Sequence, residues 1–320
     1  MNLKVLIGIL GLVAYASCSP LKLNVTQLLC NSPEAAAAAQ VSLDFINAQH
    51  THGYKYTLNQ IEDFEVVTKP DGTQVYLLEL EFLETKCHVY HPKPVSECEV
   101  RPKSEMAVEA DCDVVLSEAG GNFSVVAFKC KTEIETIDLC TGCIILDALN
   151  DTDGNQLVRN TLENLNKNHT LPAIFALHYI GRLTHQVISG GFRRTAEYAI
   201  IETNCTSVDD GSCVPLDLAV ARHGFCHAED NVNNVQAACD VFEVGSAPPA
   251  GPVSPSTKQG LKHHELTALH DPSATGYLSS ESHSAEKAPV VKRTAGDPQP
   301  ALVAKPEILL PRCPGPVIHF

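Results

Sequence analysis

The sequence predicts an α+β protein built from two tandem copies of one domain, each a helix packed on an antiparallel sheet, followed by a disordered Pro-rich tail. The octapeptide LDFINAQH beginning at Leu43 recurs as LENLNKNH beginning at Leu162. Leu43 lies 44 residues before Cys87, Leu162 lies 43 residues before Cys205, and each of these cysteines opens a group of four. The matching intervals indicate an internal duplication.

The first copy begins with a helix that has clear start and stop signals. Ser32 suits the N-cap, Pro33 suits the first helical position, and the helix is expected to end near His50, before Gly53. Strand-like segments follow, separated by proline, glycine and asparagine turns, at residues 54–67, 75–90, 97–101, 107–116 and 123–130.

The composition divides the chain into five parts. Residues 1–18 hold Lys4, an apolar run and small residues, which are typical of a signal peptide cleaved after Ala16 or after Cys18. After about Val244 the apolar periodicity disappears, which predicts a disordered tail. The expected first domain, linker, second domain and tail are residues 19–130, 131–149, 150–243 and 244–320.

Thirteen cysteines in 320 residues indicate an oxidising compartment and, with the signal peptide, a secreted extracellular protein. The net charge of −15 argues against nucleic acid or an anionic membrane as a partner, since both require a basic surface. Five Asn-x-Ser/Thr sequons are candidate glycosylation sites, at Asn24, Asn122, Asn150, Asn168 and Asn204.

The cysteine spacing favours pairing between neighbours. If Cys18 leaves with the signal peptide, twelve cysteines remain and all can pair. Only Cys140 and Cys143 have the spacing of zinc ligands or of a redox pair, and no second pair stands at a matching distance. Cys30 and Cys313 lie outside the local groups, so we expect them to tether the tail to the first domain. The neighbour pairs are Cys87–Cys98, Cys112–Cys130, Cys140–Cys143, Cys205–Cys213 and Cys226–Cys239.

Residues 78–114 carry carboxylates in i, i+2 pairs. In a strand such residues share one face about 6.6 Å apart, and neighbouring strands are about 4.8 Å apart. A carboxylate array of this kind can contact many calcium ions of a cluster or crystal at once. The alternative is an ordinary solvated sheet face. The pairs are Glu79 with Glu81, Glu97 with Glu99, and Glu109 with Asp111 and Asp113.

Enzymatic motifs are missing from the sequence, which has no Gly-x-Ser-x-Gly, P-loop or Gly-x-Gly-x-x-Gly pattern, so we expect a protein that is not an enzyme. A different motif, beginning at Gln186 and reading QVISG, approximates the Gln-x-Val-x-Gly hairpin by which cystatins wedge into papain-like proteases. The chain has no Trp, which cystatins usually carry in a second hairpin, and the first half lacks the motif, so we interpret it as a trace of ancestry. Protease inhibition is the alternative function.

Several stretches identify a family. LETKCHVYHPKPVSECEVRP, AVEADCDV, FSVVAFKC, HGFCHAE and the terminal CPGPVIHF resemble the fetuins of the cystatin superfamily. The resemblance implies two tandem cystatin-like domains, the disulfide pairing given above including Cys30–Cys313, and a plasma glycoprotein. It also implies a processing site at Lys292-Arg293.

The resemblance implies a function for the first domain as well. Fetuin-like first domains bind calcium phosphate through an acidic sheet, which limits mineral precipitation and ectopic calcification. No cofactor is implied beyond the calcium ions of the mineral. The corresponding acids are Glu79, Glu81, Glu84, Glu97, Glu99, Glu109, Asp111 and Asp113.

The linker differs from the family pattern. A branch of the family blocks astacin-type zinc proteases with a linker that reads Cys-Pro-Asp-Cys-Pro, whose aspartate approaches the enzyme's zinc. Here the linker reads Cys-Thr-Gly-Cys-Ile from Cys140 to Ile144 and carries no carboxylate. Inhibition of an astacin-type metalloprotease therefore lacks this contact, although inhibition of a cysteine protease through the QVISG hairpin remains the alternative.

Overall fold

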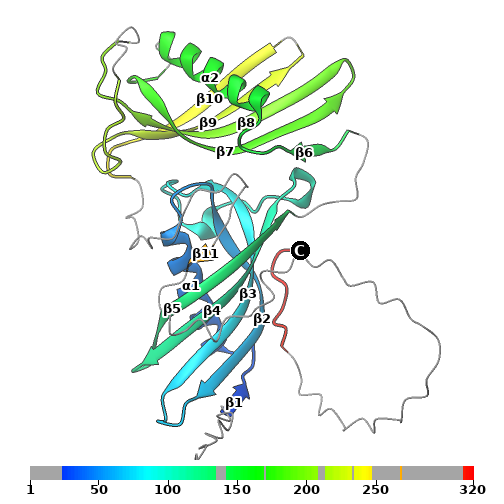
Figure 1. The fold of residues 1–320 in the computed structure, drawn as a ribbon, viewed down its shortest axis with the longest axis vertical. Helices are drawn as coiled ribbons and strands as arrows, with labels where there is room; N and C mark the ends of the chain where they lie inside the picture. Colours follow the sequence, from blue (N-terminus) through cyan, green and yellow to red (C-terminus); the bar gives the residue numbers. More distant parts are fainter. Residues whose placement is uncertain are drawn as a thin grey trace, which may run out of the picture.

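The computed structural model describes residues 24–134, 142–168, 171–207, 213–232, 234–246, 267–268 and 313–320. The expected signal peptide, Cys140, Lys292, Arg293 and most of the tail lie outside these residues. Figure 1 shows two domains, each a helix on a sheet, one above the other along the long axis. No helix in the described part of the chain is long and apolar enough to cross a membrane.

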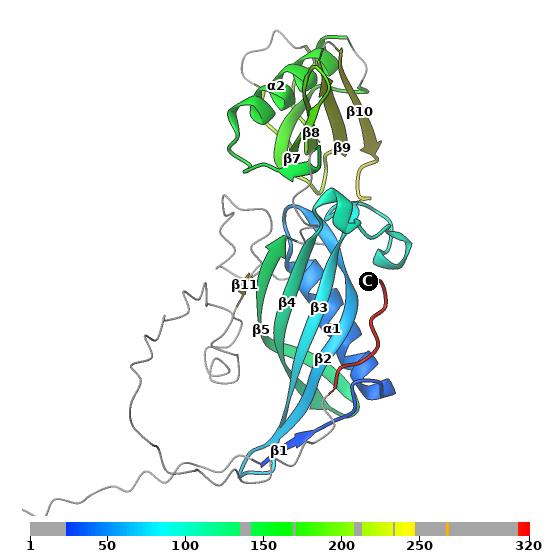
Figure 2. The same ribbon diagram turned by 90° about the vertical axis from the view of Figure 1, so that its right-hand side faces the viewer.

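The first domain is a sheet with strand order β1-β2-β3-β4-β5-β11 and a helix, α1, on one face (Figure 2). The named strands pair antiparallel with their neighbours. Its elements are β1 (Asn24–Gln27), α1 (Pro33–Gln49), β2 (Tyr54–Thr68), β3 (Gln74–His88), the 3₁₀ helices η1 (Val95–Glu97) and η2 (Lys103–Glu105), β4 (Val108–Ala119), β5 (Asn122–Ile134) and β11 (Thr267–Ala268).

Helix α1 forms where its capping residues predict. The Ser32 hydroxyl accepts a hydrogen bond from the Ala35 amide at 3.0 Å, and Pro33 occupies the first turn. The buried side of the helix is rich in alanine, which lets α1 approach the sheet closely. The packed cluster includes Ala35, Ala38, Ala39, Leu43 and Ile46 from α1 and Phe64, Leu78, Leu80, Phe82 and Leu116 from the sheet.

One expected strand is wrong. Residues 97–101 form no strand, because Val95–Glu97 turn as the 3₁₀ helix η1 and only Val100 bridges to Thr85. Pro92, Pro94 and Pro102 flank this segment, and proline cannot donate to a sheet ladder.

The second domain repeats the helix and the antiparallel sheet, with strand order β10-β9-β8-β7-β6. Helix α2 begins at its N-cap Asp151, which accepts from the Gly154 amide at 2.8 Å. The expected α+β class, two helix-on-sheet domains in tandem, is therefore confirmed. The elements are β6 (Ile144–Leu146), α2 (Thr152–Lys167), β7 (Phe175–Ile188), β8 (Gly191–Glu202), β9 (His223–Asn231) and β10 (Asn234–Phe242).

The disulfides present in the structure join the cysteines that the spacing pairs. Cys143 is also disulfide-bonded, and its expected partner Cys140 lies outside the described residues. The described bonds are Cys30–Cys313, Cys87–Cys98, Cys112–Cys130, Cys205–Cys213 and Cys226–Cys239.

The last eight residues correct the expected extent of the disordered tail. Residues 313–320, red in Figures 1 and 2, lie along the edge of β2. The Gly315 amide donates to the Ile61 carbonyl at 2.8 Å, and the Ile318 amide donates to the Asn59 carbonyl at 2.9 Å. Because the Cys30–Cys313 bond brings this segment to β2, it covers part of an otherwise open sheet edge.

Candidate functional site

The face of the first sheet opposite α1 carries rows of acids that come from adjacent strands. Asp63 of β2 lies directly opposite Glu79 of β3, and Glu79 lies opposite Asp113 of β4. In the next row Glu81 of β3 lies opposite Asp111 of β4. Directly opposite residues share a face with their Cβ atoms about 4.5–5.5 Å apart. The carboxylates therefore form a two-dimensional array.

Alternation along the strands produces this face. On β3, Leu78, Leu80 and Phe82 point to the α1 side and are buried in the core, so the intervening residues Glu79 and Glu81 point away from it. On β4, Ala110, Cys112 and Val114 belong to the same core, which leaves the three acids of that strand on the other face.

Five of the eight acids proposed from the sequence lie on this face: Glu79, Glu81, Glu109, Asp111 and Asp113. Glu97 and Glu99 do not, because they belong to η1 and the irregular segment after it. Glu99 instead pairs with Lys86 at 2.8 Å.

Glu84 is also absent from this face, because of its position in the alternation of β3. It stands an even number of residues after Leu80 and Phe82, so it points to the same side of β3 as they do. It is fully buried against Arg101, whose Nε lies 2.7 Å from its Oε1, and Arg182, whose Nη1 lies 3.2 Å from the same oxygen. A carboxylate held in this way is not available to a mineral surface.

The structure adds four acids to the array. Asp63 and Glu65 of β2 lie opposite Glu79 and Leu77, and Glu133 of β5 lies opposite Glu109. Glu62 occupies a bulge between Ile61 and Asp63. We define the acidic face as these nine residues: Glu62, Asp63, Glu65, Glu79, Glu81, Glu109, Asp111, Asp113 and Glu133. The i, i+2 spacing of Asp63 and Glu65 is the sequence signal that could have found two of them.

Burial and mutual repulsion raise the pKa values of several carboxyl groups of the acidic face. Partial burial, followed by the charges of Asp113, Asp63, Glu62 and Glu65, raises the pKa of Glu79 from 4.5 to about 7. Burial also raises the pKa of Glu62 and of Asp111, again with neighbouring carboxylates adding to it. A bound cation would relieve this repulsion.

Basic residues limit the acidic face on one side. Lys129 and Lys131 of β5 lie opposite Asp113 and Asp111 respectively, and Lys131 also pairs with Glu133. Nine acids against two lysines leave the face strongly negative over β2, β3 and β4. Within the described residues no three His, Cys, Asp or Glu side chains are arranged to enclose a metal ion. The arrangement is an open surface array rather than a chelating cage.

A second candidate site is the tip of the β7–β8 hairpin, which contains the QVISG motif. Ile188 pairs with Gly191, so Ser189 and Gly190 form a tight turn. Val187 and Phe192 on either side of it are 51% and 48% exposed. The Gln186 side chain donates to the Gly142 carbonyl at 2.7 Å, which places the cysteine-containing linker next to the hairpin.

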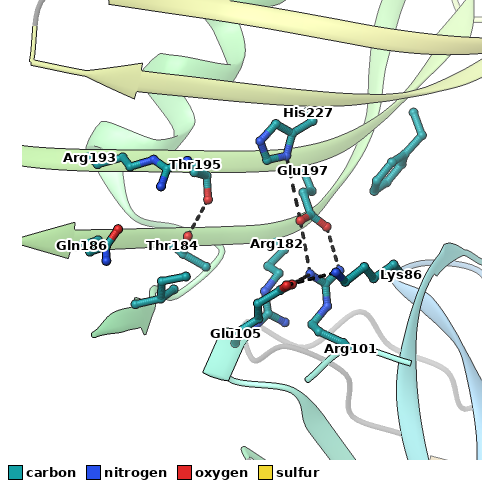
Figure 3. A pocket seen from close by; sticks show the side chains of 12 residues that line it. Lys86, Arg101, Glu105, Arg182, Thr184, Gln186, Arg193, Thr195, Glu197 and His227 are labelled. Carbon is teal, nitrogen blue, oxygen red and sulfur yellow. Dashed lines mark hydrogen bonds and ion pairs between the residues drawn. The ribbon is translucent and has the colours of Figure 1, made fainter. Parts of the chain in front are cut away.

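The pocket between the two domains has a different character (Figure 3). It has a volume of about 410 Å³ and is lined by the cations Lys86, Arg101, Arg182 and Arg193. Each of them pairs with a carboxylate. Arg101, for example, binds Glu197 of the second domain at 2.9 Å. The pocket lacks the uncompensated charge of the acidic face.

Comparison with known proteins identifies the family, although no protein-family model matches the chain. The alpha-2-HS-glycoproteins of Pan troglodytes and Homo sapiens are each 30% identical over 339 residues, which cover 91% of this chain and 91% of the relative. The chain belongs to the fetuin family. The rat alpha-2-HS-glycoprotein is likewise 30% identical, with 93% of each chain covered.

Solved fetuin structures share the fold. The crystal structure of mouse fetuin-B matches with a TM-score of 0.57 and 23% identity, covering 72% of this chain and 75% of that chain. Mouse fetuin-B in complex with crayfish astacin matches with a TM-score of 0.55 and 21% identity, covering 69% and 74%. These matches show that each domain has the helix-on-sheet fold of the fetuin domains. As a member of this family, the chain is not an enzyme. Its disulfides and its family are those of a secreted extracellular protein.

Proposed function

We propose that this fetuin is a plasma glycoprotein that binds calcium phosphate through the acidic face and inhibits mineral precipitation and ectopic calcification. The observation that carries the proposal is the in-register row Asp63–Glu79–Asp113 beside the row Glu81–Asp111. Each exposed carboxylate binds a calcium ion weakly, but many carboxylates that contact one mineral surface bind it tightly.

The raised pKa of Glu79 supports the same function. Repulsion among carboxylates is unfavourable for the folded protein alone, and it becomes favourable when calcium ions lie between the side chains. We further propose that glycans attach at Asn24, Asn122, Asn150, Asn168 and Asn204. All five side chains are exposed, so none would need to leave a core to be modified.

Inhibition of calcium phosphate precipitation tests the proposal, with two variants that each lose four negative charges. The first-domain variant is Glu79→Gln, Glu81→Gln, Asp111→Asn and Asp113→Asn. The second-domain variant is Asp153→Asn, Glu163→Gln, Asp230→Asn and Glu243→Gln. We expect the first-domain variant to lose at least tenfold in inhibitory potency and the second-domain variant to stay within twofold of the wild type. Equal potency of all three folded proteins would refute the proposal.

Protease inhibition is a second candidate, favoured by the exposed apolar tip of the β7–β8 hairpin at Val187 and Phe192. Matching proteins include fetuin-B bound to astacin and to human meprin beta. Titration against a papain-like and an astacin-type protease tests this function. Inhibition at micromolar concentration that is lost in Val187→Asp would support it, and no inhibition of either enzyme would dispose of it.

A further inference from the structure

Histidines and aromatic rings of the two domains form a cluster, and one of these rings, Phe225, also lines the pocket of Figure 3. His88, at the end of β3, is 1% exposed and stacks on Phe225 of β9 in the second domain, with ring centroids 4.5 Å apart and planes 9° apart. Phe242 of β10 lies 5.5 Å from the same ring. His223 of β9 lies 6.3 Å from His88 and binds the Tyr90 carbonyl through Nε2 at 3.1 Å.

Of the ring nitrogens of His88 and His223, only Nε2 of His223 has a hydrogen-bond partner among the described residues. Within the described residues, both ring nitrogens of His88 and Nδ1 of His223 are buried without a hydrogen bond. In the described part of the chain these side chains do not form a metal-binding group either. A neutral imidazole can fill this position as an aromatic ring, whereas an imidazolium would be a buried cation with no acceptor for its N–H groups.

The charged groups around the contact oppose protonation further. His91, His223 and Lys55 all act on His88 as cations or potential cations, and burial together with these groups lowers the pKa of His88 to about 2. Burial lowers the pKa of His223, and burial followed by His223 lowers that of His178 on β7.

His91 is the one member of the cluster with an acidic neighbour among the described groups. Burial, Lys55 and Lys93 lower its pKa, while Asp240 of β10 acts in the opposite direction. His91 also lies 5.1 Å from Phe242, so it too bridges the domains.

We propose that the His88–Phe225 contact is a pH-sensitive latch between the domains, closed at the neutral pH of extracellular fluid and released as the pH falls toward 5. Release exposes the His88 ring, which then accepts a proton and is solvated. The latch is a property of the domain junction and does not depend on the mineral-binding function.

The sign of the effect follows from linkage. An exposed histidine has a pKa of about 6.5, and the closed form holds His88 neutral, so the closed form binds fewer protons than the open form. The latch is therefore at full strength above about pH 6.5 and weakens about tenfold per pH unit below it for each imidazole that must stay neutral. His88 alone gives a weakening of about 30-fold at pH 5.

The Arg101–Glu197 ion pair next to the latch keeps its charges over this range. Burial raises the pKa of Glu197, but Arg101 and the Tyr54 hydroxyl outweigh it and leave that pKa below its usual value. We therefore expect the histidine end of the junction to open while the Arg101–Glu197 pair remains as the hinge.

A single tryptophan reports on the latch, because the chain has none of its own. In Phe242→Trp the new indole lies in the histidine cluster, and we expect its emission maximum to shift to longer wavelength between pH 7.5 and pH 5 as water enters. Adding His88→Phe preserves the stacked ring but removes the titrating group, so the ratio of the open to the closed form at pH 5 should fall about 30-fold. The matched control His319→Phe, at an exposed site, should leave the shift unchanged.

Far-ultraviolet circular dichroism on the same samples separates latch release from unfolding. Emission that shifts with an unchanged dichroism spectrum, and that depends on His88, supports the latch. An emission maximum that does not move, a shift that is the same in His88→Phe, or a shift that coincides with loss of secondary structure would each overturn it.

Discussion

The acidic face and the domain junction are both rich in charge, yet they are built in opposite ways. On the acidic face, nine acids and two lysines share one open side of the first sheet, and the pKa of Glu79 rises to about 7. At the junction, Glu84 is buried between Arg101 and Arg182, and Glu197 is held by Arg101 and Tyr54. Glu84 lies only five positions after Glu79 on β3.

This contrast distinguishes a binding surface from a structural contact. Charges of one sign that stand together in solvent destabilise the folded protein unless a ligand neutralises them. Opposite charges that are buried together fix the position of the parts they join, because removing one leaves the other without a partner. The acids of the first domain therefore cannot be treated as one site, although they are adjacent in the sequence.

The largest effect on stability is expected at the junction. Glu84→Gln leaves Arg101 and Arg182 without their shared buried carboxylate, and breaking a buried pair costs about 3–5 kcal/mol. Urea unfolding at pH 7.4 should show this loss. The control is Glu99→Gln, which removes an exposed ion pair with Lys86 and should change the free energy of unfolding by less than about 1 kcal/mol. If Glu84→Gln is as stable as Glu99→Gln, the junction network is not structural.

A smaller effect of opposite sign is expected on the acidic face. Glu79→Gln removes repulsion and should stabilise the protein by about 0.5–1 kcal/mol at pH 8, allowing for solvent screening at this partly exposed side chain. Because the folded protein holds the Glu79 proton more tightly than the unfolded chain does, the penalty is fully present above about pH 7. It disappears as the pH falls toward 4.5.

Unfolding curves of the wild type and Glu79→Gln at pH 8 and pH 4.5 check this prediction. The two proteins should differ at the higher pH and coincide at the lower one. A Glu79→Gln protein that is less stable at pH 8 would show that Glu79 makes a favourable contact instead.

The smallest effect is expected for the acids that the structure removes from the array. Glu97→Gln with Glu99→Gln lowers the charge by two but touches neither row of the acidic face. Inhibition of calcium phosphate precipitation should remain within about twofold of the wild type. The matched variant is Glu79→Gln with Glu81→Gln, which removes the same charge from the acidic face. An equal loss of inhibition in the two double variants would mean that total charge, rather than the array, controls the activity.

Sequence reasoning worked where one local rule decides the outcome. Ser32 and Pro33 place the start of α1, and the alternation around Glu79 and Asp111 places both on one face. It failed where distant parts of the chain meet. A glutamate such as Glu84 is usually exposed, and only its packing against Arg182 of the second domain shows that it is buried.

The proposed histidine latch could not be predicted from the sequence for the same reason. His88 and Phe225 are 137 positions apart, and nothing in either neighbourhood predicts that the rings stack. The contact of residues 313–320 with β2 was predicted only in part. The expected Cys30–Cys313 bond implied a tether, but the sequence did not indicate which backbone groups the segment would contact.

Adsorption to calcium phosphate particles at pH 7.4 measures mineral binding by the acidic face without the kinetics of precipitation. We expect the first-domain variant, which neutralises Glu79, Glu81, Asp111 and Asp113, to bind at least tenfold more weakly than the wild type. The second-domain variant, with the same loss of charge, should bind as the wild type does. Equal weakening of both variants would show that net charge, and not the acidic face, holds the mineral.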